Sequence, residues 1–188
     1  MTKLGEVILR DTRAAQPAAG IEGRLYYVTD ELVLERDSGS AWQSYSTVDI
    51  GCRVYNSSNI SINNNTATAL TFDSERYDTD TMHSTSSNTG RITIKTAGKY
   101  IIGATVEFAV NGTNIRQIYP QVNGSTIIAV QSAPATSGTN QTRMVFNTIY
   151  SFAVNDYIEL IAYQNSGGSL NVTVNGNYSP EFYAQKIG

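Results

Sequence analysis

The chain has 188 residues, of which 40% are hydrophobic and only 15% are charged, and its 13 basic and 16 acidic residues nearly balance. The hydrophobic content is sufficient for a core, while the charged fraction lies well below the usual value of about a quarter. No basic run is present, which excludes nucleic acid as an expected partner. No stretch approaches the ~18 consecutive apolar residues of a membrane-spanning helix, so membrane insertion is not expected either.

The N-terminus and the cysteine content indicate synthesis in the cytoplasm. Residues 1–6 (MTKLGE) lack the apolar core that a signal peptide requires. Cys52 is the single cysteine of the chain, so no internal disulfide can form. We therefore expect a protein made in a reducing compartment, without a signal peptide, whose stability depends on packing and association.

Residues 1–46 differ in composition from the remainder and are expected to form a small β module. Aromatic and β-branched residues predict strands over 23–29, 32–36 and 41–45, separated by turns. A segment of about 45 residues buries too little core to be stable without other support. We predict a β-hairpin module that depends on the main domain, a sister chain or a larger assembly.

The clearest element of the second domain, residues 47–188, is the stretch 97–110. Every second residue from Tyr100 to Val110 is apolar, which is the period of a strand with one buried face. The stretches 143–154 and 157–163 alternate in the same way. Residues that share these phases form the predicted core: Tyr100, Ile102, Val106, Phe108, Met144, Phe146, Phe152, Ile158 and Leu160.

Turn signals divide the rest of this domain into short strands, which predicts an all-β sandwich or jelly roll without helices. Asn123-Gly124 lies between two β runs and is the strongest short signal for a hairpin. Pro120 lies inside the run 116–122 and has no N–H to donate to a neighbouring strand. We therefore expect that strand to be an edge strand or to be bulged at the proline.

Residues that could perform chemistry are few. His83, the single histidine, lies in a polar loop without a nucleophile elbow, so we expect a solvated side chain and not a catalytic one. Cys52 lies in an alternating strand and is expected to be a small buried residue. One histidine and one cysteine exclude a zinc site within a single chain. The sequence predicts no enzymatic activity and no cofactor.

The densest acidic loop offers one alternative to an absence of metal. Asp73, Glu75, Asp78 and Asp80 are oxygen ligands of the kind that calcium takes from loops. Their spacing is not that of an EF-hand, and Arg76 lies among them. A solvated acidic loop is therefore the main expectation, with calcium at these four residues as the alternative.

Residues 85–110 and 140–188 resemble the jelly-roll family of the complement first-component globular head and tumour necrosis factor. The resemblance implies a compact homotrimer that binds or scaffolds and does not catalyse. No collagen repeat accompanies it here, which argues against an animal extracellular protein. The matching segments are Gly90-Arg91-Ile92-Thr93, Ala97-Gly98-Lys99-Tyr100, Glu107-Phe108, Val122-Asn123-Gly124, Val154-Asn155-Asp156-Tyr157-Ile158-Glu159-Leu160 and Phe182-Tyr183-Ala184.

A trimer would explain why the long strands carry apolar residues on both faces. A monomeric sandwich needs only one apolar face in each strand, so the second set requires a cover. Packing around a threefold axis would supply that cover. The predicted interface residues are Ile101, Val145, Ile149, Tyr157, Ile161 and Tyr183.

The segment 19–42 looks like short modules in virion proteins of tailed phages, where such modules precede fibre or surface domains. This resemblance implies a structural protein on the virion surface, whose partners are itself, a major capsid protein or tail proteins. A capsid decoration protein is the first expectation, because the chain is small and has no fibrous shaft. A short tail-fibre tip that binds a host surface glycan or protein is the alternative. The predicted attachment residues are Arg24, Tyr26, Tyr27 and Trp42.

Overall fold

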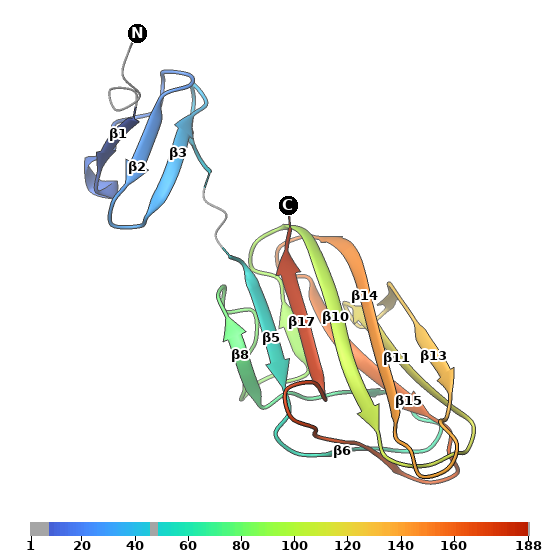
Figure 1. The fold of residues 1–188 in the computed structure, drawn as a ribbon. Coiled ribbons are helices and arrows are strands. Elements are labelled where there is room, and N and C mark those ends of the chain that lie inside the picture. Colours follow the sequence, from blue (N-terminus) through green and yellow to red (C-terminus); the bar gives the residue numbers. More distant parts are fainter. Residues whose placement is uncertain (1–7, 46–48, 188) are drawn as a thin grey trace. The chain divides into compact units, whose positions relative to one another are not determined.

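The computed structural model describes residues 8–45 and 49–187. The chain divides into two compact units, residues 1–48 and 49–188, so the division falls two residues beyond the expected 46/47 boundary. Figure 1 shows both units as all-β folds. Within the described ranges, no helix has the length and hydropathy to cross a membrane.

The first unit is a four-stranded sheet in the order β1-β2-β3-β4, which adds one strand to the three expected from the sequence. The additional strand, β1, pairs with β2 in parallel. Three residues between these two strands form a 3-10 helix. The elements are β1 (Ile8–Asp11), η2 (Arg13–Ala15), β2 (Leu25–Val28), β3 (Val33–Asp37) and β4 (Trp42–Ser44).

Apolar contacts in the first unit are few, and a buried carboxylate supplements them. Tyr26 is 2% exposed and its ring centroid lies 5.7 Å from that of Trp42. The fully buried carboxylate of Asp37 accepts hydrogen bonds from the backbone N–H groups of Gly20, Ile21 and Gly39. It also pairs with the guanidinium of Arg24 at 2.7 Å. Asp37 thus connects the 17–24 loop to the β3–β4 turn.

The second unit consists of two sheets, which Figure 1 shows as a front and a rear layer. The front layer has the order β6-β16-β10-β17-β5-β8, and β14 pairs with the free side of β10. Its strands are β5 (Gly51–Tyr55), β6 (Ile60–Ile62), β8 (Ser74–Asp78), β10 (Gly98–Phe108), β14 (Thr142–Phe152), β16 (Leu170–Val172) and β17 (Glu181–Lys186).

The rear layer has the order β12-β11-β15-β7, with β13 on β11 and β9 on β15. A two-layer sandwich buries one face of each sheet and leaves the other face outward. Its strands are β7 (Thr68–Ala69), β9 (Arg91–Thr93), β11 (Ile115–Val122), β12 (Thr126–Ile127), β13 (Gln131–Pro134) and β15 (Tyr157–Gln164).

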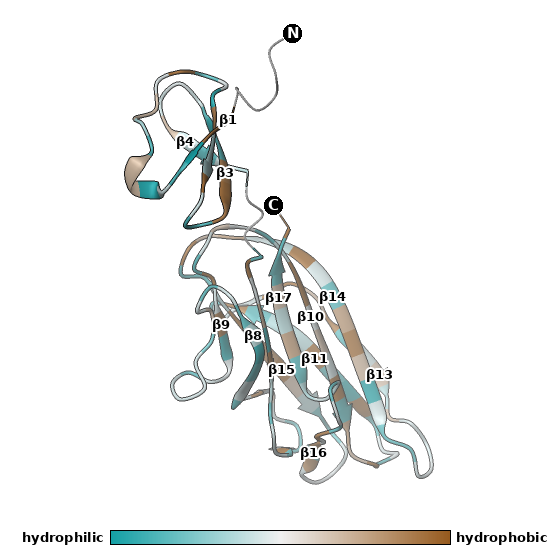
Figure 2. Ribbon diagram, turned by 60° about the vertical axis from the view of Figure 1, so that its left-hand side comes forward, coloured by the Kyte–Doolittle hydropathy of each residue, from teal (hydrophilic) through white to brown (hydrophobic). Residues whose placement is uncertain are grey.

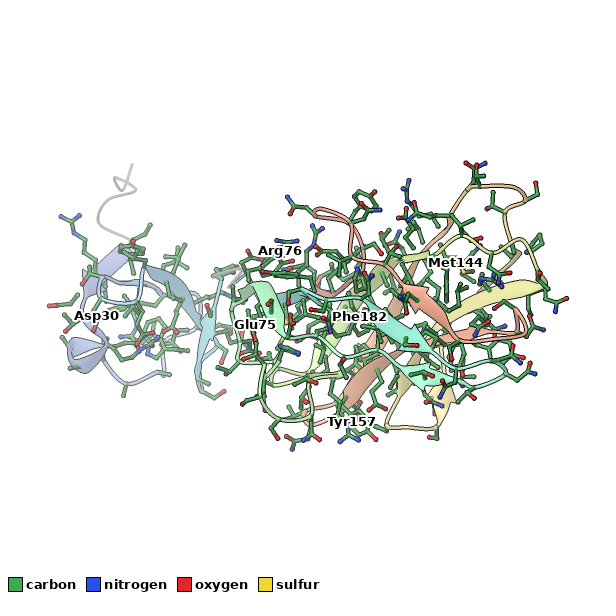
Figure 3. All side chains as sticks on the ribbon, turned by 90° about the horizontal axis from the view of Figure 1, so that it is seen from below. Asp30, Glu75, Arg76, Met144, Tyr157 and Phe182 are labelled. Atoms are coloured by element: carbon green, nitrogen blue, oxygen red, sulfur yellow. The ribbon has the colours of Figure 1, made fainter. Side chains whose placement is uncertain are left out.

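The core between the layers contains all nine residues that the alternation predicted, each at most 7% exposed. Phe108 is fully buried, whereas β10 ends there and Val110 is 49% exposed beyond it. Figure 2 shows the alternation as brown and teal bands along β14. Figure 3 shows Arg76 and Tyr157 on opposite sides of this unit, with Phe182 between them.

Turns behave as expected at Asn123-Gly124 and differently at Pro120. Asn123 and Gly124 have φ of 52° and 69°, the left-handed values that a type I′ hairpin turn requires. Pro120 lies in β11, which is an interior strand with β15 on one side. On its other side the neighbour changes from β12 to β13 next to Pro120. Because Pro120 has no N–H to donate, the pairing on that side is divided between β12 and β13. The proline does not place β11 at the edge of the sheet.

Replacing Phe108 with alanine should lower the free energy of unfolding by about 3–5 kcal/mol, because a fully buried ring is lost and a cavity remains. Chemical denaturation of the full chain measures this difference. Val110→Ala is the control, since a half-exposed side chain outside the strand should change stability by less than about 0.5 kcal/mol. Similar losses in both variants would contradict the observed strand phase.

The first unit should lose stability in acid. Burial alone raises the pKa of Asp37, but the N–H groups of Ile21, Gly39 and Gly20 and the guanidinium of Arg24 outweigh it, so the pKa falls from 3.8 to about 2. A lowered folded pKa stabilises the fold above pH 3.8, and this stabilisation is lost as the pH falls towards 2. Trp42, the single tryptophan, reports on this unit by fluorescence. Asp37→Asn should reduce the dependence and leave the part that comes from Glu35 and Glu31, whose pKa values the hydrogen bonds from Arg13 lower. Glu22→Gln, which alters an exposed carboxylate, should preserve the dependence.

Candidate interaction face

The outward side of the front layer carries an apolar patch in the single chain. Ile101 of β10 lies opposite Ile149 of β14, and Thr105 lies opposite Val145. Ile149 is 60% exposed and Val145 is 50% exposed. Together with Asn147, Ile101 and Ile149 line a shallow hollow in this surface. We call the outward side chains of β14, β10 and β17 the front face.

Two glycines allow side chains of β17 to lie flat on this face. A Cβ on Gly103 would lie 2.4 Å from the hydroxyl of Tyr183 and 2.3 Å from Oδ1 of Asn147. The missing side chain lets the Tyr183 hydroxyl cross β10 and donate a hydrogen bond to Asn147 on β14. Gly51 likewise makes room for Gln185, whose Oε1 would lie 2.0 Å from an added Cβ. The two glycines therefore leave the space in which the side chains of Tyr183 and Gln185 lie along the sheet surface.

Buried carboxylates hold arginines at one end of the front layer. Glu181 is 3% exposed and binds both Arg53, at 2.7 Å, and Arg76, at 2.8 Å. The guanidinium of Arg76 also lies 3.8 Å from the ring centroid of Tyr55. These contacts neutralise Glu181 and fix both arginines in place.

A second carboxylate, Glu107, has the same role nearby on β10. Its fully buried side chain pairs with Arg143 of β14, whose guanidinium lies 4.7 Å from the ring centroid of Tyr178. Asn175 donates a further hydrogen bond to the Glu107 carboxylate. The front face therefore combines an apolar centre with fixed arginine and tyrosine side chains, a composition typical of protein interfaces.

Four of the six predicted interface residues belong to the front face: Ile101, Val145, Ile149 and Tyr183. Tyr157 and Ile161 belong to β15 in the rear layer, so they cannot share one face with the others. Ile161 is only 6% exposed in the single chain, where its register partners are Tyr119 of β11 and Ala69 of β7. The expectation that Ile161 needs a partner subunit to cover it is wrong.

The predicted attachment residues also separate into two groups. Tyr26 is buried, Trp42 donates its indole N–H to the carbonyl of Pro17, and the guanidinium of Arg24 lies 4.9 Å from the Trp42 ring centroid. These three stabilise the unit itself, and Tyr26 is not available as a surface residue. Tyr27 lies on the opposite side of β2, where it lines a hollow with Ile8, Arg10 and Leu34.

The four acidic residues considered for calcium do not gather. Within the described ranges, no three His, Cys, Asp or Glu side chains form a group that could hold a metal ion. Asp73 accepts hydrogen bonds from Ser57 and Ser74, which lower its pKa against the effect of burial. Asp78 accepts the N–H groups of Asp80, Met82 and His83. The loop uses these carboxylates for its own backbone.

His83 and Cys52 are both structural in their surroundings. The His83 side chain is fully buried and not solvated as expected, with Nδ1 2.9 Å from Glu75 Oε1 and Nε2 3.1 Å from the carbonyl of Thr89. Cys52 is fully buried, as predicted, and burial raises the pKa of its thiol. Neither residue has the exposed, activated setting of a nucleophile or a general base.

Comparison with protein families found no family model that matches this chain. One relative is an uncharacterized protein, L688, of Acanthamoeba polyphaga mimivirus, which is 33% identical over 88 residues. The match covers 45% of this chain and 37% of the mimivirus protein. The chain therefore spans well under half of that relative.

Three solved structures resemble the second unit in fold. They are the tumour necrosis factor Eiger of S. frugiperda (9% identity, TM-score 0.55), the globular domain of zebrafish complement 1qA (10%, 0.52) and murine APRIL (9%, 0.56). They cover 73–74% of this chain, which in turn covers 93–99% of theirs. Residues of the second unit therefore have the jelly-roll fold of the tumour necrosis factor and complement globular-head proteins.

Proposed function

We propose that this protein is a non-enzymatic structural protein of a virion surface, assembled as a homotrimer through the front face. The observation that carries the proposal is the apolar patch of Ile101, Val145 and Ile149, which the single chain leaves uncovered. Burial of a fully exposed side chain of this kind contributes roughly 1.5–3 kcal/mol, so covering these half-exposed ones contributes about half of that for each copy in a trimer. The viral relative and the jelly-roll fold support this reading.

The arrangement of charge on the front layer also favours association. Obligate interfaces exclude unpaired charges from their centres, while arginine and tyrosine are enriched in them. Arg143 is paired with Glu107, whereas Arg53 and Arg76 share Glu181, so a partner surface that covers them would need to supply only one further acidic group. We infer that the apolar centre and the ion-paired arginines of this layer form a binding surface for another protein.

Capsid decoration is the role that we propose first. In this role the first unit binds the particle and the jelly roll faces outward. The division into two units, with a hollow formed by Ile8, Arg10, Tyr27 and Leu34 on the first, supports a separate attachment function. A short tail-fibre tip that binds a host surface molecule is the second candidate. Electron cryomicroscopy of the particle distinguishes the two by location.

Sedimentation equilibrium at micromolar concentration should give about three times the 20.4 kDa chain mass. Ile149→Arg should shift the protein towards monomer, because an unpaired charge buried in an interface costs several kcal/mol. Ile127→Arg is the matched control, since Ile127 is 48% exposed on β12 of the rear layer. A monomeric parent protein, or equal effects of both substitutions, would remove the basis for the trimer.

The fragment 49–188 should remain folded and trimeric but should no longer bind particles from which the protein has been removed. Tyr27→Asp in the full chain should weaken binding in the same assay, because it places a carboxylate in the hollow of the first unit. Leu32→Asp is the control, since Leu32 is 73% exposed in the β2–β3 turn. An unfolded fragment, or undiminished cosedimentation with particles, would contradict the attachment role.

A further inference from the structure

A polar cavity of about 230 Å³ lies beside β9 in the second unit. The loop between β8 and β9, β9 itself and the β9–β10 connection form its walls; β9 is labelled in Figure 2. Its volume is below the ~300–1,000 Å³ of pockets for drug-sized ligands, so it suits a single sugar unit or a small charged group. None of its residues belongs to the front face.

Two cations and no carboxylate line this cavity. Arg91 is oriented by two contacts: its Nε donates to Glu159 at 3.0 Å, and its guanidinium lies 4.0 Å from the ring centroid of Tyr157. Its terminal nitrogens make no hydrogen bond among the described residues. Lys95 is exposed and has no ion-pair partner within 8–45 and 49–187. The cavity thus offers a ligand the terminal N–H donors of an oriented, ion-paired guanidinium and one exposed ammonium group.

Glu159 compensates the charge of Arg91, so among the described residues Lys95 is the uncompensated cation of the cavity, and the other neighbouring carboxylates are held by groups of their own loop. Glu75 pairs with the buried His83 ring, and Glu159 pairs with Arg91. Asp78 is saturated by backbone N–H groups of its own loop. Asp80 is not among the residues that line the cavity. An anion that enters would meet cations, hydroxyls and an amide.

The remaining lining favours a ligand that carries hydroxyl groups besides its charge. Ser87, Asn88 and Thr93 can each donate and accept hydrogen bonds, as the hydroxyl groups of a sugar also do. Thr81 and Asn88 have φ of 50° and 51°, a left-handed conformation that a β-branched residue such as threonine rarely adopts. Backbone strain of this kind is concentrated at binding and functional sites.

We propose that this cavity binds an acidic monosaccharide unit, with Arg91 and Lys95 on its carboxylate and Ser87, Asn88 and Thr93 on its hydroxyls. An acidic sugar would be the host surface ligand of the second candidate role, the tail-fibre tip, and the biological meaning of the site rests on that role. The binding itself does not depend on trimer formation or on attachment. A site for one charged sugar is weak alone, and several copies on a particle would raise its avidity.

Titration of the full chain with N-acetylneuraminate or glucuronate, followed by NMR chemical shifts, should give saturable binding in the millimolar range. Glucose, which lacks the charge, and acetate, which keeps the carboxylate but lacks the hydroxyls, should each bind at least about tenfold more weakly, since a charge-assisted contact or several hydrogen bonds are missing. No saturation with either acidic sugar, or acetate binding as tight as theirs, would overturn the proposal.

Lys95→Gln should weaken acidic-sugar binding by about tenfold, as expected for the loss of one charge-assisted hydrogen bond. Lys95 is exposed, so the variant should fold normally. Arg36→Gln changes the net charge equally at a partly exposed position of the first unit, away from the cavity, and should leave binding unchanged. Equal weakening in both variants would reduce the effect to overall charge and contradict the site. Sedimentation of Lys95→Gln separates this result from the trimer proposal, because its mass should match that of the parent protein.

Discussion

The antiparallel pairing of β10 with β14 is the constraint on which the rest of the second unit depends. The two strands of 11 residues pair along their whole length, from Gly98 opposite Phe152 to Phe108 opposite Thr142. A shift of one residue would move every core side chain of a strand to the opposite face. The same register that buries Phe108 and Met144 therefore places Ile101 beside Ile149 on the outside. Core and front face are two consequences of one alignment.

Arginine side chains compensate two buried carboxylates that this alignment creates. The outward phase of β10 and β17 places Glu107 and Glu181 where they are almost completely buried, and a lone buried carboxylate is strongly unfavourable. Arg143, Arg53 and Arg76 compensate these charges. Such pairs add little net stability compared with apolar packing, but they require one arrangement of strands. We interpret them as determinants of the shape of the face more than of its stability.

The sequence predicts those parts of the fold that follow from local alternation and turn chemistry. The phase of β10, the core set and the Asn123-Gly124 turn are read from neighbouring residues. The features that the sequence does not predict depend on contacts between distant segments. The strand β1 joins its sheet through parallel pairing with β2, and Glu181 contacts Arg53 across a separation of 128 residues. Ile161 shows the limit most clearly, because alternation assigns it to an outer face but cannot tell that its own neighbours cover it.

Gly103 links the sequence to the candidate site. A glycine in the middle of a long strand weakens that strand, so its presence signals that another group approaches the backbone closely. Here the group is the Tyr183 side chain, which reaches Asn147 across the space above Gly103 and joins three strands on one surface. A larger residue at position 103 would push the Tyr183 ring outward, and the ring would then protrude from the surface between Ile101 and Val145. Gly103 thus lowers the local strand propensity, but it leaves the Tyr183 side chain room to lie along the surface. A second copy of the chain could then cover that surface.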